Sequence, residues 1–212
     1  MLDLPCVGTV AGVTRIIGGF AGSLTLAVPR FGTRPTTDRV REAIFSALEA
    51  RDALDGARVL DLYAGSGALG LEAASRGAAH VTLVDRAEAA TRTARENTAR
   101  VRKAAPRGRA LDIVVSTQPV QSFVAGSAAT WDVVFLDPPY ELGGAELRHV
   151  LEALVPRLAP DGVAIVERSA RDRAPEWPEG LELERRRDYG ETALYWLARS
   201  EETYPTPPSQ SA

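Results

Sequence analysis

The tetrapeptide Asp137-Pro138-Pro139-Tyr140 is the stretch of this sequence whose residue types are best suited to chemistry. It follows a short apolar run, residues 133–136, which is typical of a buried strand. Prolines have no N–H to donate, so the chain must leave the strand there and turn. A carboxylate, rigid carbonyl groups and an aromatic ring are then held together at the strand end. These groups suit a planar base with an exocyclic amine, because the ring can stack on the base and the oxygens accept from N–H donors.

A glycine-rich loop lies upstream, where residues 61–70 read DLYAGSGALG. Gly65, Gly67 and Gly70 satisfy the pattern G-x-G-x-x-G, in which glycines let the backbone approach a nucleotide-like ligand and turn into a helix. Asp85 ends the next predicted strand, about 20 residues after Gly65, where a carboxylate can accept from both ribose hydroxyls. By position alone, this pattern also fits an NAD-dependent oxidoreductase.

The carboxylate of Asp61 favours a different ligand. It ends the strand before the glycine loop, where it disfavours a nearby pyrophosphate and suits a ligand that carries an amine. S-adenosylmethionine (AdoMet) has no phosphate and carries both an α-ammonium and a sulfonium. A hydride-transfer site also has no need of the acceptors at Asp137. The acids therefore favour AdoMet over a dinucleotide.

Alternating strand and helix patterns must position these groups. Strands are predicted over residues 57–62, 80–84, 111–115, 131–136 and 163–166, with a closing antiparallel pair over 181–187 and 193–197. Helices are predicted over residues 67–76, 87–103 and 147–158, with a short one that begins at Pro119. This alternation predicts right-handed crossovers and a parallel, doubly wound α/β sheet with an antiparallel edge. Open sheets of this kind bind ligands at the carboxyl ends of their strands, where the three acids fall.

A basic arm precedes the predicted core. Residues 15–17 and 23–28 bracket three glycines, which predicts a β-hairpin, and a helix capped by Thr36 or Thr37 follows. Between residues 13 and 41, Asp38 is the only acid among five arginines, namely Arg15, Arg30, Arg34, Arg39 and Arg41. This asymmetry indicates a surface for RNA phosphates, and an amphipathic helix that covers the sheet is the alternative.

The composition is that of one soluble globular domain. The 212 residues, 45% of them hydrophobic, can bury a substantial core, and the single cysteine can form no internal disulfide, which favours the cytoplasm. No apolar run reaches the ~20 residues of a membrane span. The net charge of −3 argues against a strongly basic nucleic-acid binder. His80, His149 and Cys6 show no ligand spacing, so we expect no metal.

Four segments together resemble the RsmD-type 16S rRNA (guanine-N2)-methyltransferases. They are residues 15–19, 34–42, 61–70 and 137–140, and the resemblance extends from about Val13 to Arg199. The glycine loop and Asp-Pro-Pro-Tyr are shared with many AdoMet enzymes, so the hairpin and the segment RPTTDRVRE are the specific part. The resemblance implies a seven-stranded class I methyltransferase fold, AdoMet as methyl donor and a guanine N2 amine of 16S rRNA in the 30S subunit as acceptor.

The resemblance assigns roles to residues at the matching positions. The catalytic residues are Asp137, Pro138 and Tyr140. The cofactor-binding residues are Asp61, Tyr63, Ala64, Gly65, Ser66, Gly67, Asp85, Arg86, Ser116, Thr117 and Asp137. The RNA-binding residues are Arg15, Arg34, Thr36, Arg39 and Arg41. Ser116 and Thr117 stand where this family often carries an acid or an asparagine beside the adenine.

We divide the chain into four segments. Residues 1–12 are expected to be disordered or to precede a natural start at Val13, 13–52 form the arm, 53–200 the methyltransferase core and 201–212 a disordered tail. We expect a monomer without metal or membrane contact. The alternatives are another amino-methyltransferase, acting on DNA adenine or cytosine or on protein glutamine, an NAD-dependent oxidoreductase, and a non-catalytic RNA-binding or assembly module.

Overall fold

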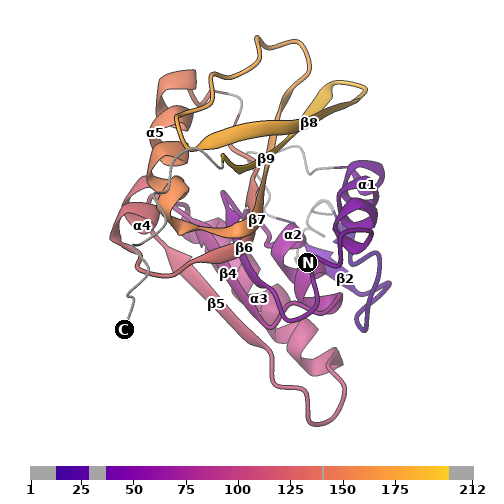
Figure 1. The fold of residues 1–212 in the computed structure, drawn as a ribbon. Helices are drawn as coiled ribbons and strands as arrows, with labels where there is room; N and C mark the ends of the chain where they lie inside the picture. Colours follow the sequence, from indigo (N-terminus) through magenta and orange to yellow (C-terminus); the bar gives the residue numbers. More distant parts are fainter. Residues whose placement is uncertain (1–12, 29–36, 140, 201–212) are drawn as a thin grey trace, which may run out of the picture.

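The computed structural model describes residues 13–28, 37–139 and 141–200 (Figure 1). The terminal segments expected to be disordered lie outside these ranges, as do three residues with predicted site roles, Arg34, Thr36 and Tyr140. No helix within the ranges is both long and apolar enough to cross a membrane.

The centre of the fold is a seven-stranded sheet with the order β5-β4-β3-β6-β7-β9-β8. The strands are β3 (Arg58–Leu62), β4 (His80–Asp85), β5 (Asp112–Thr117), β6 (Trp131–Leu136), β7 (Leu158–Ser169), β8 (Leu181–Tyr189) and β9 (Thr192–Arg199). The first five strands in this order pair in parallel, and β9 runs antiparallel to both β7 and β8. The predicted doubly wound sheet with an antiparallel edge is therefore confirmed.

Helices cover both faces of the sheet. The helices α1 (Asp38–Glu49), α2 (Ala68–Ser75) and α3 (Glu88–Ala104) pack with one apolar cluster, and α4 (Val120–Gly126) and α5 (Gly144–Leu154) pack with the other. Successive strand residues point to opposite faces, so Val59 joins the first cluster and Leu60 the second. Figure 1 shows α1 and α5 on opposite sides of the sheet. We call these sides the α1 face and the α5 face.

The predicted boundaries are wrong between the fourth and fifth strands of the core. The helix expected over 147–158 lies at Gly144–Leu154 and is followed by a 3-10 turn. Pro156 explains the early end, because it has no N–H for the i−4 carbonyl. The strand expected over 163–166 is β7, which begins at Leu158 and passes through residues 160–162, where its register with β6 shifts.

The predicted N-terminal hairpin and its helix are present. Strand β1 (Val13–Arg15) pairs antiparallel with β2 (Thr25–Ala27). Helix α1 follows Thr37, whose hydroxyl accepts from the N–H of Val40 at 3.4 Å. Thr37 is thus the N-cap, one of the two threonines that the sequence indicates for this role.

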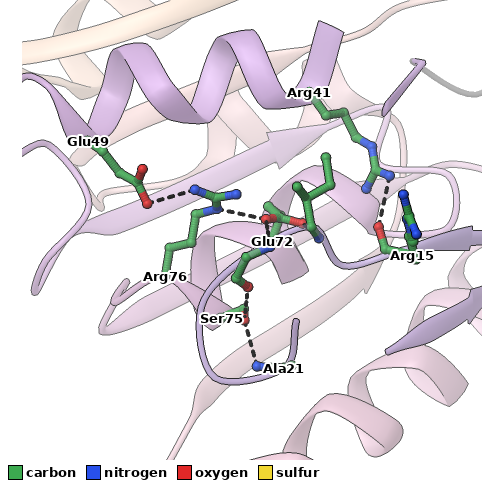
Figure 2. Close-up of polar contacts among 9 residues, drawn as sticks. Arg15, Ala21, Arg41, Glu49, Glu72, Ser75 and Arg76 are labelled. Carbon is green, nitrogen blue, oxygen red and sulfur yellow. Dashed lines mark hydrogen bonds and ion pairs between the residues drawn. The ribbon is translucent and has the colours of Figure 1, made fainter. Parts of the chain in front are cut away.

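The turn of the hairpin is docked on α2 (Figure 2). The fully buried carboxylate of Glu72 accepts from the N–H groups of Ile17 at 2.6 Å and Gly18 at 2.8 Å. A Cβ at Gly19 would lie 2.0 Å from the carbonyl oxygen of Ser75, and the φ of Gly19 is +73°. The glycines of the family-specific segment therefore let the arm approach the core closely.

Candidate active site

Three carboxylates meet at the carboxyl ends of β3, β4 and β6. Leu62 of β3 is paired with Val84 of β4 and with Leu136 of β6. Asp85 and Asp137 follow these two residues directly, so they lie at the same level of the sheet. Alternation directs Asp61, Asp85 and Asp137 to the α1 face, since the residue beside each belongs to the α5-face cluster. The convergence that the sequence predicts is therefore confirmed, while the individual roles remain predictions.

Asp61 lies at the bottom of this site and is 1% exposed. Burial raises the pKa of its carboxyl to about 7, the N–H of Gly70 lowers it through a 2.8 Å hydrogen bond, and the charges of Asp137 and Asp85 raise it further. The carboxylate anchors the start of α2. The ionised form would gain from a bound cation, because nearby positive charge favours a carboxylate.

The glycine loop brings main-chain groups to the rim of the site. Gly67 is the N-cap of α2 with a φ of +79°, and a Cβ there would lie 2.8 Å from a methyl group of Leu83. Asp85 accepts from the N–H of Gly65 at 2.9 Å and from the N–H of Ala87 at 2.8 Å. Each carboxylate oxygen keeps a further lone pair, so the predicted contact with ribose hydroxyls stays open to Asp85.

Other predicted cofactor residues are engaged with the protein. The hydroxyl of Thr117 contacts that of Thr91 and accepts from Arg95, both at 2.8 Å. The hydroxyl of Ser116 accepts from Gln118 at 2.8 Å. Contact of Ser116 or Thr117 with an adenine therefore stays a prediction, and the hydrogen bonds of these hydroxyls hold the end of β5 in place.

Tyr63 differs from the expectation for a cofactor-binding side chain. It leaves β3 with a φ of +61°, and its ring packs against the α5-face cluster. Burial, followed by the charge of Glu146, raises the pKa of its hydroxyl to about 12. The ring of Tyr63 is partly buried on the α5 face, and the cofactor contacts expected of Tyr63, Ala64 and Ser66 stay predictions. Arg86 is exposed beyond the end of β4.

The residues that follow Asp137 are held by β7. Pro138 is buried, and the carbonyl of Pro139 accepts from the N–H of Leu142 at 2.9 Å. Arg168, which is 9% exposed, donates to the carbonyl of Leu142 at 3.1 Å. The turn after β6 is therefore supported from the adjacent strand.

Comparison with known proteins agrees with this arrangement. The family model "Conserved hypothetical protein 95" matches residues 14–198. The chain is 36% identical over 184 residues to "Ribosomal RNA small subunit methyltransferase D" of Escherichia coli (strain K12), over 86% of this chain and 88% of that protein. It is 34% identical over 188 residues to "Putative rRNA methyltransferase YlbH" of Bacillus subtilis (strain 168), over 85% of this chain and 96% of that protein. The chain belongs to the RsmD-type family.

Solved structures support the same fold. "Putative methyltransferase yhhF from Escherichia coli" has a TM-score of 0.75 and 35% identity, over 89% of this chain and 98% of that chain. Magnesium protoporphyrin IX methyltransferase (ChlM) from Synechocystis PCC 6803, solved with bound SAM, has a TM-score of 0.60 at 16% identity, over 80% and 87%, and shows the fold alone. The predicted class I methyltransferase fold is confirmed, and the cofactor of this RsmD-type protein is AdoMet.

The arm of this RsmD-type chain divides its arginines between surface and core. The side chain of Arg15 is 65% exposed, and Arg39 is exposed on α1. Arg41 is 1% exposed, and its Nη2 donates to Thr14 at 2.9 Å, to the carbonyl of Arg15 at 2.8 Å and to Asp38 at 2.6 Å. The predicted RNA contact of Arg41 is wrong for this geometry, because helical periodicity turns the side chain inward, where it joins α1 to β1.

Two residues beside the site were not identified from the sequence. Asn97 of α3 is fully buried and contacts both the arm and the glycine loop. Its position on the apolar stripe of α3 is the signal that could have revealed it, since a polar residue there must find buried partners. Glu167 of β7 lies beside Asp137 on the α1 face, because β6 and β7 pair in register up to the preceding residue.

Proposed function

We propose that this protein transfers a methyl group from AdoMet to the exocyclic N2 amine of a guanine in small-subunit (16S) rRNA. The observation that carries the proposal is the meeting of Asp61, Asp85 and Asp137 on one face at the strand ends, beside a turn that can accept hydrogen bonds from an amine. The names of the relatives that cover most of the chain support rRNA as the substrate class.

The site fits AdoMet better than a dinucleotide. Asp137 and Asp85 each raise the pKa of Asp61, so the three acids concentrate negative charge at these strand ends. Such a site disfavours a pyrophosphate and suits a ligand with two cationic groups. Asp61 would face the α-ammonium end, Asp85 the ribose, and the end of β5 the adenine.

The residues of the turn after β6 would orient the acceptor. When bound, AdoMet supplies the methyl group as an electrophilic carbon. Asp137 and the carbonyl of Pro138 would accept from the N2 hydrogens of a guanine that has been flipped out of its stack. These contacts direct the nitrogen lone pair toward the methyl carbon and stabilise the positive charge that grows on N2. Asp137 then takes the proton that N2 loses.

The decisive experiment maps the product. Small subunits that lack the modification would be incubated with the protein and AdoMet labelled in its methyl group, and the labelled nucleotide would be identified by mass spectrometry. We expect the label on the N2 amine of one guanine. Label on another base or on protein would contradict the proposal in favour of a different amino-methyltransferase.

Matched substrates separate the remaining alternatives. Naked 16S rRNA, intact small subunits and double-stranded DNA would be compared at equal nucleotide concentration. We expect small subunits to be the best substrate, because the name of a relative that covers most of the chain points to rRNA of the small subunit. AdoMet binding without transfer to any of them would instead support an assembly module.

A further inference from the structure

The outer strand β8 carries three consecutive arginines, and alternation divides them between the two faces of the sheet. Arg187 is paired with Leu194 of the α1-face cluster. Arg186 is paired with Tyr195 of the α5-face cluster, and its guanidinium lies 5.3 Å from that ring. Arg187 therefore shares a face with the three carboxylates of the site, and Arg186 does not.

A row of paired residues connects Arg187 to the site. Leu194 of β9 is also paired with Glu167 of β7, which lies beside Asp137. Three strand spacings put Arg187 roughly 14 Å from Asp137 at the same level of the sheet. A strand of RNA whose base is held at Asp137 has flanking phosphates within reach of this position.

The neighbouring arginines differ in their electrostatic partners. Arg186 donates to both carboxylate oxygens of Asp188, at 2.8 and 3.1 Å. Arg187 is exposed and has no acidic partner within the described part of the chain. The positive charge of Arg187 is therefore available to an anion, while that of Arg186 is already paired with Asp188.

A stacked guanidinium extends this surface along β8. Arg185 lies 4.7 Å from the centroid of the Trp196 ring on the α1 face, and Arg51 lies 5.3 Å from the same ring. Stacking fixes a guanidinium plane and leaves the donors at its edge for two oxygens of an anion such as phosphate. Arg185 and Arg187 are two residues apart on the same face, about 7 Å along the strand.

We propose that Arg187 binds the RNA backbone beside the target base, and that Arg185, two residues away on the same face, binds it further along the strand. Strand β8 is then a second RNA contact, distinct from the N-terminal arm. This inference rests on the proposed function. Arginines on an outer strand can also serve to prevent edge-to-edge pairing of sheets, and the test must separate the two roles.

The test compares Arg187→Gln with Arg186→Gln, a matched pair of neighbouring residues on opposite faces. Binding to unmodified small subunits would be measured at several salt concentrations, with AdoMet affinity and thermal unfolding as controls. For Arg187→Gln we expect an affinity loss of about 3- to 10-fold and a salt slope smaller by about 0.7 to 1, because one phosphate contact is lost. For Arg186→Gln we expect less than about a twofold change, and Arg187→Lys should retain most of the affinity.

Several outcomes would overturn the inference. Equal effects of Arg186→Gln and Arg187→Gln, or a wild-type salt slope in both, would remove the assigned contact. Self-association of Arg187→Gln with unchanged RNA binding would assign Arg187 to edge protection instead. A wild-type protein that neither binds nor methylates small subunits would refute both the proposed function and this inference. If the wild-type protein methylates small subunits and Arg187→Gln binds them as tightly as the wild type does, this inference alone is refuted.

Discussion

The side-chain amide of Asn97 donates a hydrogen bond of 3.0 Å to the carbonyl of Ser66, so α3 holds the glycine loop directly. The same side chain accepts from the N–H of Ala27 and donates to its carbonyl, both at 2.9 Å. One fully buried residue therefore fixes β2 of the arm and the cofactor loop relative to each other. The arm and the cofactor site are parts of one hydrogen-bonded unit.

Replacement of Asn97 should affect both parts at once. Asn97→Leu would leave partly buried main-chain groups of Ala27 and Ser66 without these partners, and we expect the free energy of unfolding to fall by about 2–4 kcal/mol. We also expect AdoMet affinity to fall at least several-fold at a temperature where the variant is folded. Thr98→Val is the control, because its buried hydroxyl donates to the carbonyl of Ala94 in its own helix. Denaturant titration and calorimetry measure the two effects, and wild-type values for Asn97→Leu would contradict the assignment.

Arg39 and Arg41 should separate RNA binding from folding. Arg41→Met removes the three hydrogen bonds of a buried guanidinium, and we expect it to destabilise the protein by about 2–4 kcal/mol. Arg39→Gln should leave stability within about 0.5 kcal/mol, because the residue is exposed on α1. It should reduce the salt slope of RNA binding by about 0.7 to 1 if it contacts a phosphate. An unchanged salt slope would indicate that Arg39 contacts no phosphate and that α1 only covers the sheet.

Asp137→Ala should separate catalysis from cofactor binding. We expect turnover to fall by about 10²- to 10⁴-fold, because both the acceptor for the amine and the base for its proton are lost. AdoMet affinity should stay within about threefold of wild type, since Asp61, Asp85 and the glycine loop remain. Methyl transfer under single-turnover conditions and calorimetry provide the two measurements. Near-wild-type turnover would show that Asp137 does not hold the acceptor amine.

The buried carboxyl of Asp61 should give the protein without cofactor a characteristic pH dependence. Its pKa is raised from 3.8 to about 7, so the folded chain holds this proton more tightly than the unfolded chain. The contribution to stability is therefore complete below about pH 4 and is lost as pH rises to about 7, by up to about 1.4 kcal/mol per pH unit. Asp61→Asn cannot ionise and should lack this slope. Denaturant titrations from pH 4 to 7 would measure the free energy of unfolding of the wild type and of Asp61→Asn. Equal dependence on pH in both proteins would contradict this role of Asp61.

The affinity for AdoMet should depend on pH in the opposite direction from the stability of the free protein. A cationic ligand favours the ionised form of Asp61, so its binding releases a proton and affinity should rise as pH increases through about 7. Calorimetry in buffers of different ionisation enthalpy counts the released proton. In Asp61→Asn, we expect weaker binding and no proton release near neutral pH.

The sequence by itself determined the order of strands and helices and the place of the chemistry. Strand alternation and crossover handedness require Asp61, Asp85 and Asp137 to meet at one edge, because parallel strands end together. The hairpin, a threonine cap at position 36 or 37 and the antiparallel edge also follow from local periodicity and turn residues, and the structure selects Thr37 as the cap. These features depend on interactions within a few residues, which a linear pattern records.

The tertiary structure alone decided which polar side chains are partners across the fold. Arg41 and Arg39 look equivalent in a basic segment, yet α1 turns one into the interface with β1 and the other to solvent. Asn97 and Ser66 are 31 residues apart and meet only because α3 packs beside the glycine loop. The apolar spacing of a helix can indicate which residues face inward, but the partners that they meet there depend on how distant segments pack, so no local pattern of residues contains them.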